Sequence, residues 1–149
     1  MWEGNWAWGV PLIVLTSVVH VLGLRLVWRA VGRVLVWGPA RWQTAPLVAA
    51  MSLALLLTTA LHALEAAVWA LTYLLVGALP DARTAMLYSV SALTTYGHAS
   101  TLLPEHWRML GALEALNGMI LFGLTTAFLF AMIQDLWSAG GRRTLGSVE

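Results

Sequence analysis

The stretch that decides the fold reads Ser89-Val-Ser-Ala-Leu-Thr-Thr-Tyr-Gly-His-Ala-Ser100. Its first part is apolar, and it runs into a Thr-Thr-x-Gly turn. A helix needs about 20 apolar residues to cross the hydrocarbon core of a membrane, so this stretch is too short to cross. It lies between two long hydrophobic runs and is too apolar for an ordinary loop. The pattern predicts a segment that enters the bilayer and returns to the same side.

The composition is that of a membrane protein with several crossings. Hydrophobic residues make up 60% of the 149 residues, charged residues make up 10%, and the mean hydropathy is +0.77. In soluble domains about a quarter of the residues are charged. The net charge of +1 suggests no nucleic-acid partner, and the absence of Cys excludes disulfides and thiolate chemistry. No nucleophile–base pair or ligand set has a convincing spacing, so we expect neither an enzyme nor a bound cofactor.

Three apolar runs are long enough to cross the bilayer, which predicts an all-α membrane protein. The crossings are expected at about Trp8 to Leu24, within Pro46 to Leu79, and at about Met109 to Leu136. Between the last two, Asp81 is a favourable N-cap for a short helix from Ala82 to Leu93. A helix of that length spans about 18 Å, roughly half a bilayer. We therefore expect three transmembrane helices and one re-entrant helix.

This order of elements divides the chain into three parts. Residues 1–44 are expected to form a peripheral transmembrane helix and a basic loop. Residues 45–137 form a module of outer helix, short helix, turn and inner helix. Gly140 and Gly141 are expected to end the last helix, and residues 138–149 to form a disordered cytoplasmic tail.

The arginines predict an orientation in the membrane. Those around the first inter-helix loop and after the last helix are Arg25, Arg29, Arg33, Arg41, Arg142 and Arg143. The positive-inside rule therefore places the N-terminus outside and the C-terminus in the cytoplasm. The four-residue spacing of Arg25, Arg29 and Arg33 also fits a voltage-sensing helix. Because these residues follow the apolar run instead of lying within it, contact with lipid headgroups is the better interpretation.

The turn after the short helix sets a condition on assembly. Non-helical backbone at membrane depth has to be buried in protein or line a water-filled cavity. One copy of this chain is too small to shield residues 95–100, whereas several copies around an axis would shield them. The partly negative C-terminal end of each short helix would favour a cation at that axis. A symmetric oligomer around a cation pathway follows as a hypothesis.

The same residues resemble the two-helix pore module of the potassium channel superfamily, including its bacterial members. The resemblance covers about residues 46–132, and its motifs are Leu93-Thr94-Thr95-x-Gly97, Leu103-Pro104-Glu105-x-Trp107-Arg108 and Glu114-Ala115-Leu116-Asn117-Gly118. It implies a homotetrameric channel in a bacterial inner membrane. The expected permeant ion is K⁺ or Na⁺, held by backbone carbonyls of the filter, and the expected surroundings are membrane lipids.

The filter positions that the resemblance implies are Thr94, Thr95, Tyr96, Gly97, His98 and Ala99. Thr95 takes the place of the family's filter threonine, and Gly97 takes the place of its first glycine. His98, Ala99 and Ser100 stand where the family has Tyr, Gly and Asp. Selectivity for potassium therefore does not follow. The alternative is a non-conducting relative that senses pH or a metal, or that serves as a structural subunit.

Polar residues within the apolar runs form a second group of expected site residues, because a carboxylate inside a membrane span is costly. Glu65, Glu114, His62, Ser100 and Asn117 are expected to support the filter from behind. His62 and Glu65 lie on one helical face at i,i+3, which predicts a hydrogen-bonded pair. A metal site formed with His98 and a proton relay are the alternatives.

Three further residues keep two interpretations each. His98 is either a group at the pore mouth that gates by protonation or binds a metal, or a neutral side chain that braces the filter. Gly118 and Gly123 permit either close helix packing or a bend in the inner helix.

Overall fold

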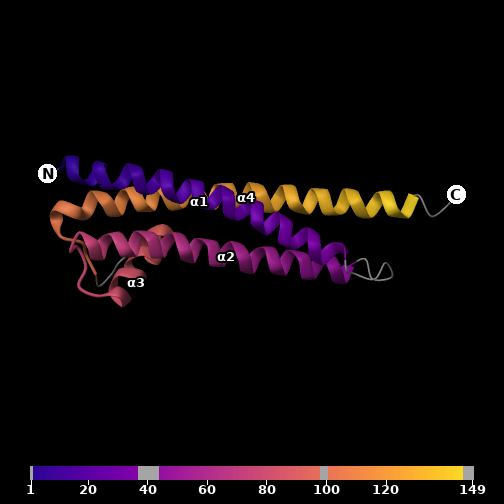
Figure 1. Ribbon diagram of the computed structural model, residues 1–149, viewed down its shortest axis with the longest axis horizontal. Helices are drawn as coiled ribbons and strands as arrows, with labels where there is room; N and C mark the ends of the chain where they lie inside the picture. Colours follow the sequence, from indigo (N-terminus) through magenta and orange to yellow (C-terminus); the bar gives the residue numbers. More distant parts are fainter. Residues whose placement is uncertain (1, 37–43, 98–100, 146–149) are drawn as a thin grey trace.

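The computed structural model describes residues 2–36, 44–97 and 101–145. The elements in chain order are α1 (Trp2–Val36), α2 (Thr44–Leu75), α3 (Ala82–Leu93), the short 3-10 helix η1 (Glu105–Trp107) and α4 (Arg108–Leu145). Three long helices run along one another, and the short α3 lies beside one end of α2 (Figure 1). No strand occurs in the described ranges, so the prediction of an all-α chain is confirmed there.

The three long helices are long and apolar enough to cross a membrane, as predicted. The candidate spans are Glu3–Arg33, Leu47–Leu75 and Glu105–Ser138. α1 is longer than the expected crossing, because the arginines after the apolar run continue the helix, and arginine is a good helix former. The expected end of the last helix at Gly140 is wrong, since α4 continues to Leu145. A glycine costs a helix only about 1 kcal/mol, which does not stop it.

The start of α1 and the short α3 lie at one end of the bundle, and the end of α4 lies at the other (Figure 1). Asn5 fixes the first of these ends. Its side-chain amide donates to the carbonyl of His106 at 2.7 Å, and its carbonyl accepts from the backbone N–H of Leu110 at 3.0 Å. The start of α1 is therefore attached to the start of α4.

The predicted short helix is present with the predicted bounds, Ala82–Leu93. Gly77, with φ of +66°, lies in the turn that ends α2. Asp81 then caps α3, accepting from the Thr84 N–H at 3.0 Å and from the Thr84 hydroxyl at 2.7 Å. The backbone hydrogen bond from Thr84 is the main reason why the pKa of Asp81 is below its usual value. A local capping signal therefore sets the start of α3.

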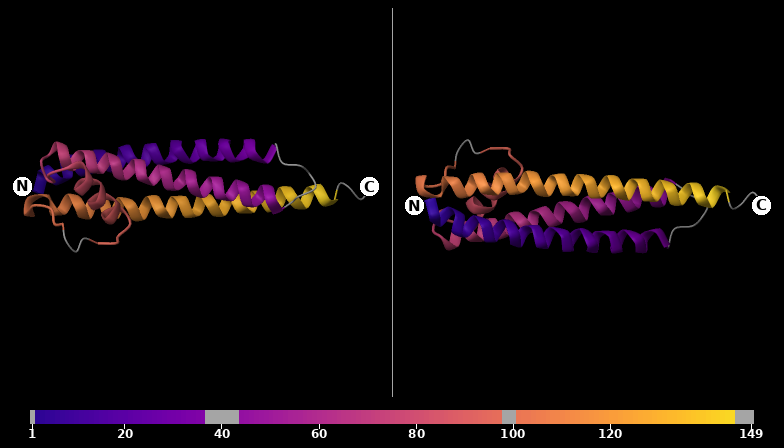
Figure 2. Two further views of the ribbon diagram at one scale, coloured as in Figure 1. Left: turned by 90° about the horizontal axis from the view of Figure 1, so that it is seen from below. Right: turned by 90° about the horizontal axis from the view of Figure 1, so that it is seen from above.

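α3 packs between α2 and α4 (Figure 2). On the α2 side, the rings of Tyr73 and Tyr88 meet edge to face with centroids 5.2 Å apart. On the α4 side, a Cβ added at Gly111 would overlap the Tyr88 hydroxyl, and one added at Gly118 would overlap the Leu93 carbonyl. The absence of side chains at these glycines lets α3 approach α4 closely.

Candidate functional site

The turn that ends α3 is hydrogen-bonded back to the last turn of the helix. The Thr94 N–H and hydroxyl both donate to the Val90 carbonyl, at 3.0 and 2.8 Å. Thr95 has φ of +57° and Gly97 has φ of +89°. The left-handed region is unusual for a β-branched residue such as threonine, and strained backbone of this kind costs of order 1–3 kcal/mol. The chain thus leaves α3 through a turn that its sequence does not favour intrinsically.

Thr94, Thr95, Tyr96 and Gly97 are exposed in the single chain, and the Tyr96 side chain is the extreme case with 87% of its surface exposed. They are therefore available to a second copy of the chain, to water or to an ion. His98, Ala99 and Ser100, the other expected filter and support positions, lie outside the described residues, and the expectations for them stay predictions.

Glu114 lies directly behind α3. Its carboxyl accepts a hydrogen bond from the Tyr73 hydroxyl of α2 at 2.6 Å and is hydrogen-bonded to the Ser89 hydroxyl of α3. Ser89 also contacts the Ala66 carbonyl of α2 at 2.7 Å. All of these side chains are buried. Glu114 therefore joins three helices at the middle of α3, in the place expected for a residue that supports the turn.

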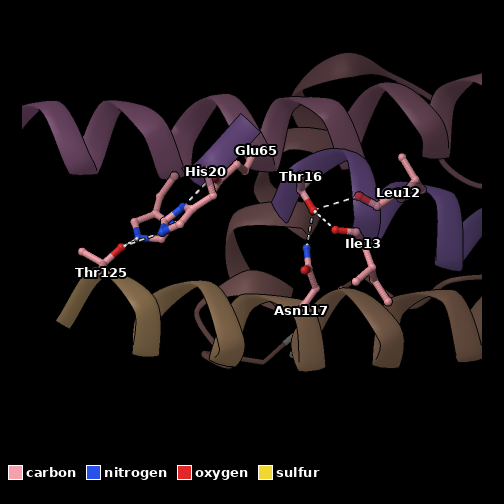
Figure 3. Close-up of polar contacts among 8 residues, drawn as sticks. Leu12, Ile13, Thr16, His20, Glu65, Asn117 and Thr125 are labelled. Carbon is pink, nitrogen blue, oxygen red and sulfur yellow. Dashed lines mark hydrogen bonds and ion pairs between the residues drawn. The ribbon is translucent and has the colours of Figure 1, made fainter. Parts of the chain in front are cut away.

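Glu65 and His62 lie elsewhere. Their predicted pair exists, with His62 Nδ1 3.0 Å from Glu65 Oε2. The remaining contacts differ from the expectation, because they join α2 to α1 and α4 and none of them is with α3. Glu65 Oε1 lies 2.8 Å from Nδ1 of His20 on α1. Figure 3 draws this contact as a dashed line. Sequence reasoning gave His20 no partner, although it is the only titratable side chain in the apolar part of α1.

Thr125 of α4 closes this cluster into a ring (Figure 3). Its hydroxyl oxygen lies 3.0 Å from Nε2 of His62 and 3.2 Å from Nε2 of His20. Each imidazole is therefore held at both nitrogens, between the carboxylate and the hydroxyl. The four side chains are buried, with His20 and Glu65 fully so. We call this group the histidine ring.

Among the described residues, this is where three side chains of metal-ligand type come together, with ligand atoms of His20, His62 and Glu65 within 4.8 Å of one another. Among the described residues the third member is His20, and His98, the third member that the sequence suggested, lies outside them. Both carboxylate oxygens and all four ring nitrogens already form hydrogen bonds. An ion could enter only by replacing several of them.

Asn117 also differs from the expectation. Its side-chain amide donates to the Thr16 hydroxyl of α1 at 2.8 Å, so it joins α4 to α1 (Figure 3). Gly118, the next residue, supports the packing interpretation through its contact with Leu93. A Cβ at Gly123 would meet no atom within 4 Å, so close packing within the chain does not explain that glycine.

Comparisons with protein-family models, curated proteins and solved structures found no match to this chain.

Proposed function

We propose that this chain assembles as a homotetramer in a bacterial inner membrane, with its N-terminus outside and its C-terminus in the cytoplasm, and conducts monovalent cations. The observation that carries the proposal is the short helix α3, packed between two candidate spans and ending in an exposed polar turn. Residues 94–97 would line the ion pathway. The altered residues 98–100 leave the choice between K⁺ and Na⁺ open.

The depth of the turn supports this proposal. Ser89 contacts Ala66, nine residues before the end of α2, which corresponds to about 14 Å along that helix. Leu93 packs on Gly118, ten residues into α4, or about 15 Å. A hydrocarbon core is about 30 Å thick, so in a membrane the turn would lie near its middle. Exposed irregular backbone is not tolerated there in contact with lipid, and it has to face protein or water.

The charge at this position supports a cation and not an anion. α3 directs its C-terminal end, with the partial negative charge of its last carbonyls, toward the turn. Carbonyl oxygens and threonine hydroxyls are the groups that replace water around a monovalent cation. Glu114 would keep α3 in place through Tyr73 and Ser89. A fourfold repeat of this arrangement would give a ring of oxygen ligands.

A flux assay tests the proposal. Purified protein in liposomes is expected to pass K⁺ or Na⁺, and Gly97→Val is expected to abolish the flux, because valine is strained at φ of +89°. Gly32→Val is the matched control, since a side chain there would meet no atom within 4 Å. Absence of flux for every common cation between pH 5 and pH 8 would overturn the proposal, as would a monomer in a measurement of mass in nanodiscs.

A non-conducting membrane protein that senses pH is the second candidate. The histidine ring favours it, because two imidazoles and a carboxylate in the centre of three helices could couple protonation to helix packing. This candidate predicts that helix packing, followed by tryptophan fluorescence, changes with pH while no ion flux appears.

A further inference from the structure

We propose that His20, His62, Glu65 and Thr125 form a proton-binding site that holds one proton more than an ionised carboxylate and two neutral imidazoles carry. The proposal stands on contacts within one chain, so it does not depend on ion conduction. The additional proton is shared between a histidine of α1 and a histidine of α2.

The number of protons follows from the number of hydrogen bonds. The ring contains four of them, two at Glu65 with lengths of 2.8 and 3.0 Å and two at Thr125 with lengths of 3.0 and 3.2 Å. Each hydrogen bond needs one proton. The Thr125 hydroxyl supplies one, and each neutral imidazole supplies one, which makes three. The fourth bond needs a further proton, and with Glu65 ionised this proton converts one imidazole into an imidazolium.

The charge of the ring supports the same count. One carboxylate and one imidazolium sum to zero, whereas a carboxylate with two neutral imidazoles would leave a single buried negative charge. His20 and Glu65 have no exposed surface, and an unpaired charge in such a place is costly. The ring is therefore neutral only when it holds the additional proton.

No other described ionisable group on the packed helices is placed to neutralise the ring. α1 contributes His20 itself, and the nearest charged residue on that helix, Arg25, is exposed and lies about 8 Å further along the axis. α2 contributes His62 and Glu65. α4 contributes only the hydroxyl of Thr125. Glu114 lies eleven residues earlier, about 16 Å away along the helix, and Asp135 is exposed and lies ten residues later, about 15 Å away.

A divalent metal ion fits this site less well than a proton. With Glu65 ionised and both imidazoles neutral, such an ion would leave one buried positive charge, and it would break the hydrogen bonds that the ring already makes. The contacts therefore favour the proton, and a bound metal is an outcome that the experiment has to distinguish.

The ring has two equivalent arrangements. In one, His20 is the imidazolium and the Thr125 hydroxyl donates to His62; in the other, the roles of the two histidines are exchanged. Conversion breaks the N–H bond at His20 Nε2 while an O–H bond forms at Thr125, and breaks the original O–H bond while an N–H bond forms at His62 Nε2. Thr125 is unchanged at the end. A proton has then moved from α1 to α2.

The decisive variant is Glu65→Gln. A glutamine has nearly the same shape, accepts through its carbonyl and donates through its amide, so it supplies the fourth proton itself. We expect the ring to remain closed with two neutral imidazoles. The imidazolium is then lost without a loss of hydrogen bonds. Thr125→Ser is the matched control, because it keeps the hydroxyl and is expected to keep the imidazolium.

The measurement is nitrogen-15 nuclear magnetic resonance of labelled histidine in full-length protein in metal-free nanodiscs. Replacing His98 and His106 by glutamine leaves His20 and His62 as the sole labelled imidazoles. At pH 8 we expect half of the imidazole to be imidazolium, against about 3% for an ordinary histidine. Glu65→Gln is expected to remove this signal, while Thr125→Ser retains it.

Three results would overturn the proposal. The first is two neutral histidines in the otherwise unchanged ring at pH 8. The second is an imidazolium signal that persists in a folded Glu65→Gln variant. The third is one equivalent of Zn²⁺ bound on addition, with shifted Nδ1 signals of both histidines, which would make the ring a metal site. If Glu65→Gln does not fold, the equal amounts of imidazolium and neutral imidazole expected at pH 8 still test the number of protons in the ring.

Discussion

The contact between Gly118 and Leu93 predicts that Gly118→Ala destabilises the protein. Gly123 on the same helix provides the control, because it makes no such contact. A Cβ at Gly118 would lie 2.8 Å from the Leu93 carbonyl carbon and 2.9 Å from its Cα, and it would overlap the carbonyl oxygen. These are backbone atoms, so a change of rotamer cannot relieve the overlap. Gly118→Ala therefore has to displace the end of α3 from α4. Overpacking of this kind costs about 1–3 kcal/mol.

The higher helix propensity of alanine partly offsets this overpacking cost. Alanine is a better helix former than glycine by about 1 kcal/mol. We expect Gly118→Ala to destabilise the protein by up to about 2 kcal/mol, since the larger overpacking cost is reduced by the helix gain. In Gly123→Ala only the gain in helix propensity remains, because no atom lies within 4 Å of the added Cβ.

Thermal unfolding followed by circular dichroism in detergent micelles would measure both variants. We expect the midpoint temperature of Gly118→Ala to fall below that of the unchanged protein, and that of Gly123→Ala to equal or exceed it. A Gly118→Ala protein at least as stable as Gly123→Ala would refute the close approach of α3 to α4. In the flux assay, Gly118→Ala is expected to reduce conduction, since it moves the turn.

Three further variants test the polar contacts by unfolding measurements. Tyr73→Phe leaves one oxygen of the buried Glu114 carboxyl without its 2.6 Å donor and should cost about 1–3 kcal/mol; unchanged stability would contradict that contact. Asn5→Leu leaves a buried N–H of α4 unpaired and should cost a similar amount of about 1–3 kcal/mol, so a neutral effect would count against the attachment. Asp81→Asn keeps a cap but removes the titration. The pKa of Asp81 is lowered by Thr84, so its stabilisation is complete above the unfolded value of about 4 and is lost as pH falls through the folded value. The unchanged protein should therefore lose stability below about pH 4 relative to Asp81→Asn, and parallel pH profiles would exclude this role.

Local signals were sufficient to predict most of the helical framework. The start of α3 depends on Asp81 and Thr84, three residues apart, and the three candidate spans depend on runs of apolar residues. The pairing of His62 with Glu65 also follows from spacing along one helix. In each case the interacting groups are neighbours in the sequence, so the sequence pattern contains the information.

The rotation of the long helices could not be predicted in the same way. Each is apolar nearly all round, so it has no polar face that indicates which side meets which neighbour. The positions of Glu65 and Asn117 within the predicted spans placed them at the depth of the turn. The direction in which their side chains point depends on tertiary packing. Both face α1, where their partners are His20 and Thr16. The left-handed backbone at Thr95 could not be predicted either, because threonine does not favour it.

Glu114 and Gly118 have a joint consequence for the motions of this protein. They lie four residues apart on one face of α4, and both contact α3, through Ser89 and Leu93. α3 cannot slide along α4 or rotate against it without breaking both contacts. α3 and the first half of α4 should therefore open as one cooperative unit. In hydrogen exchange their backbone amides are expected to share one protection free energy, distinct from that of the far end of α4.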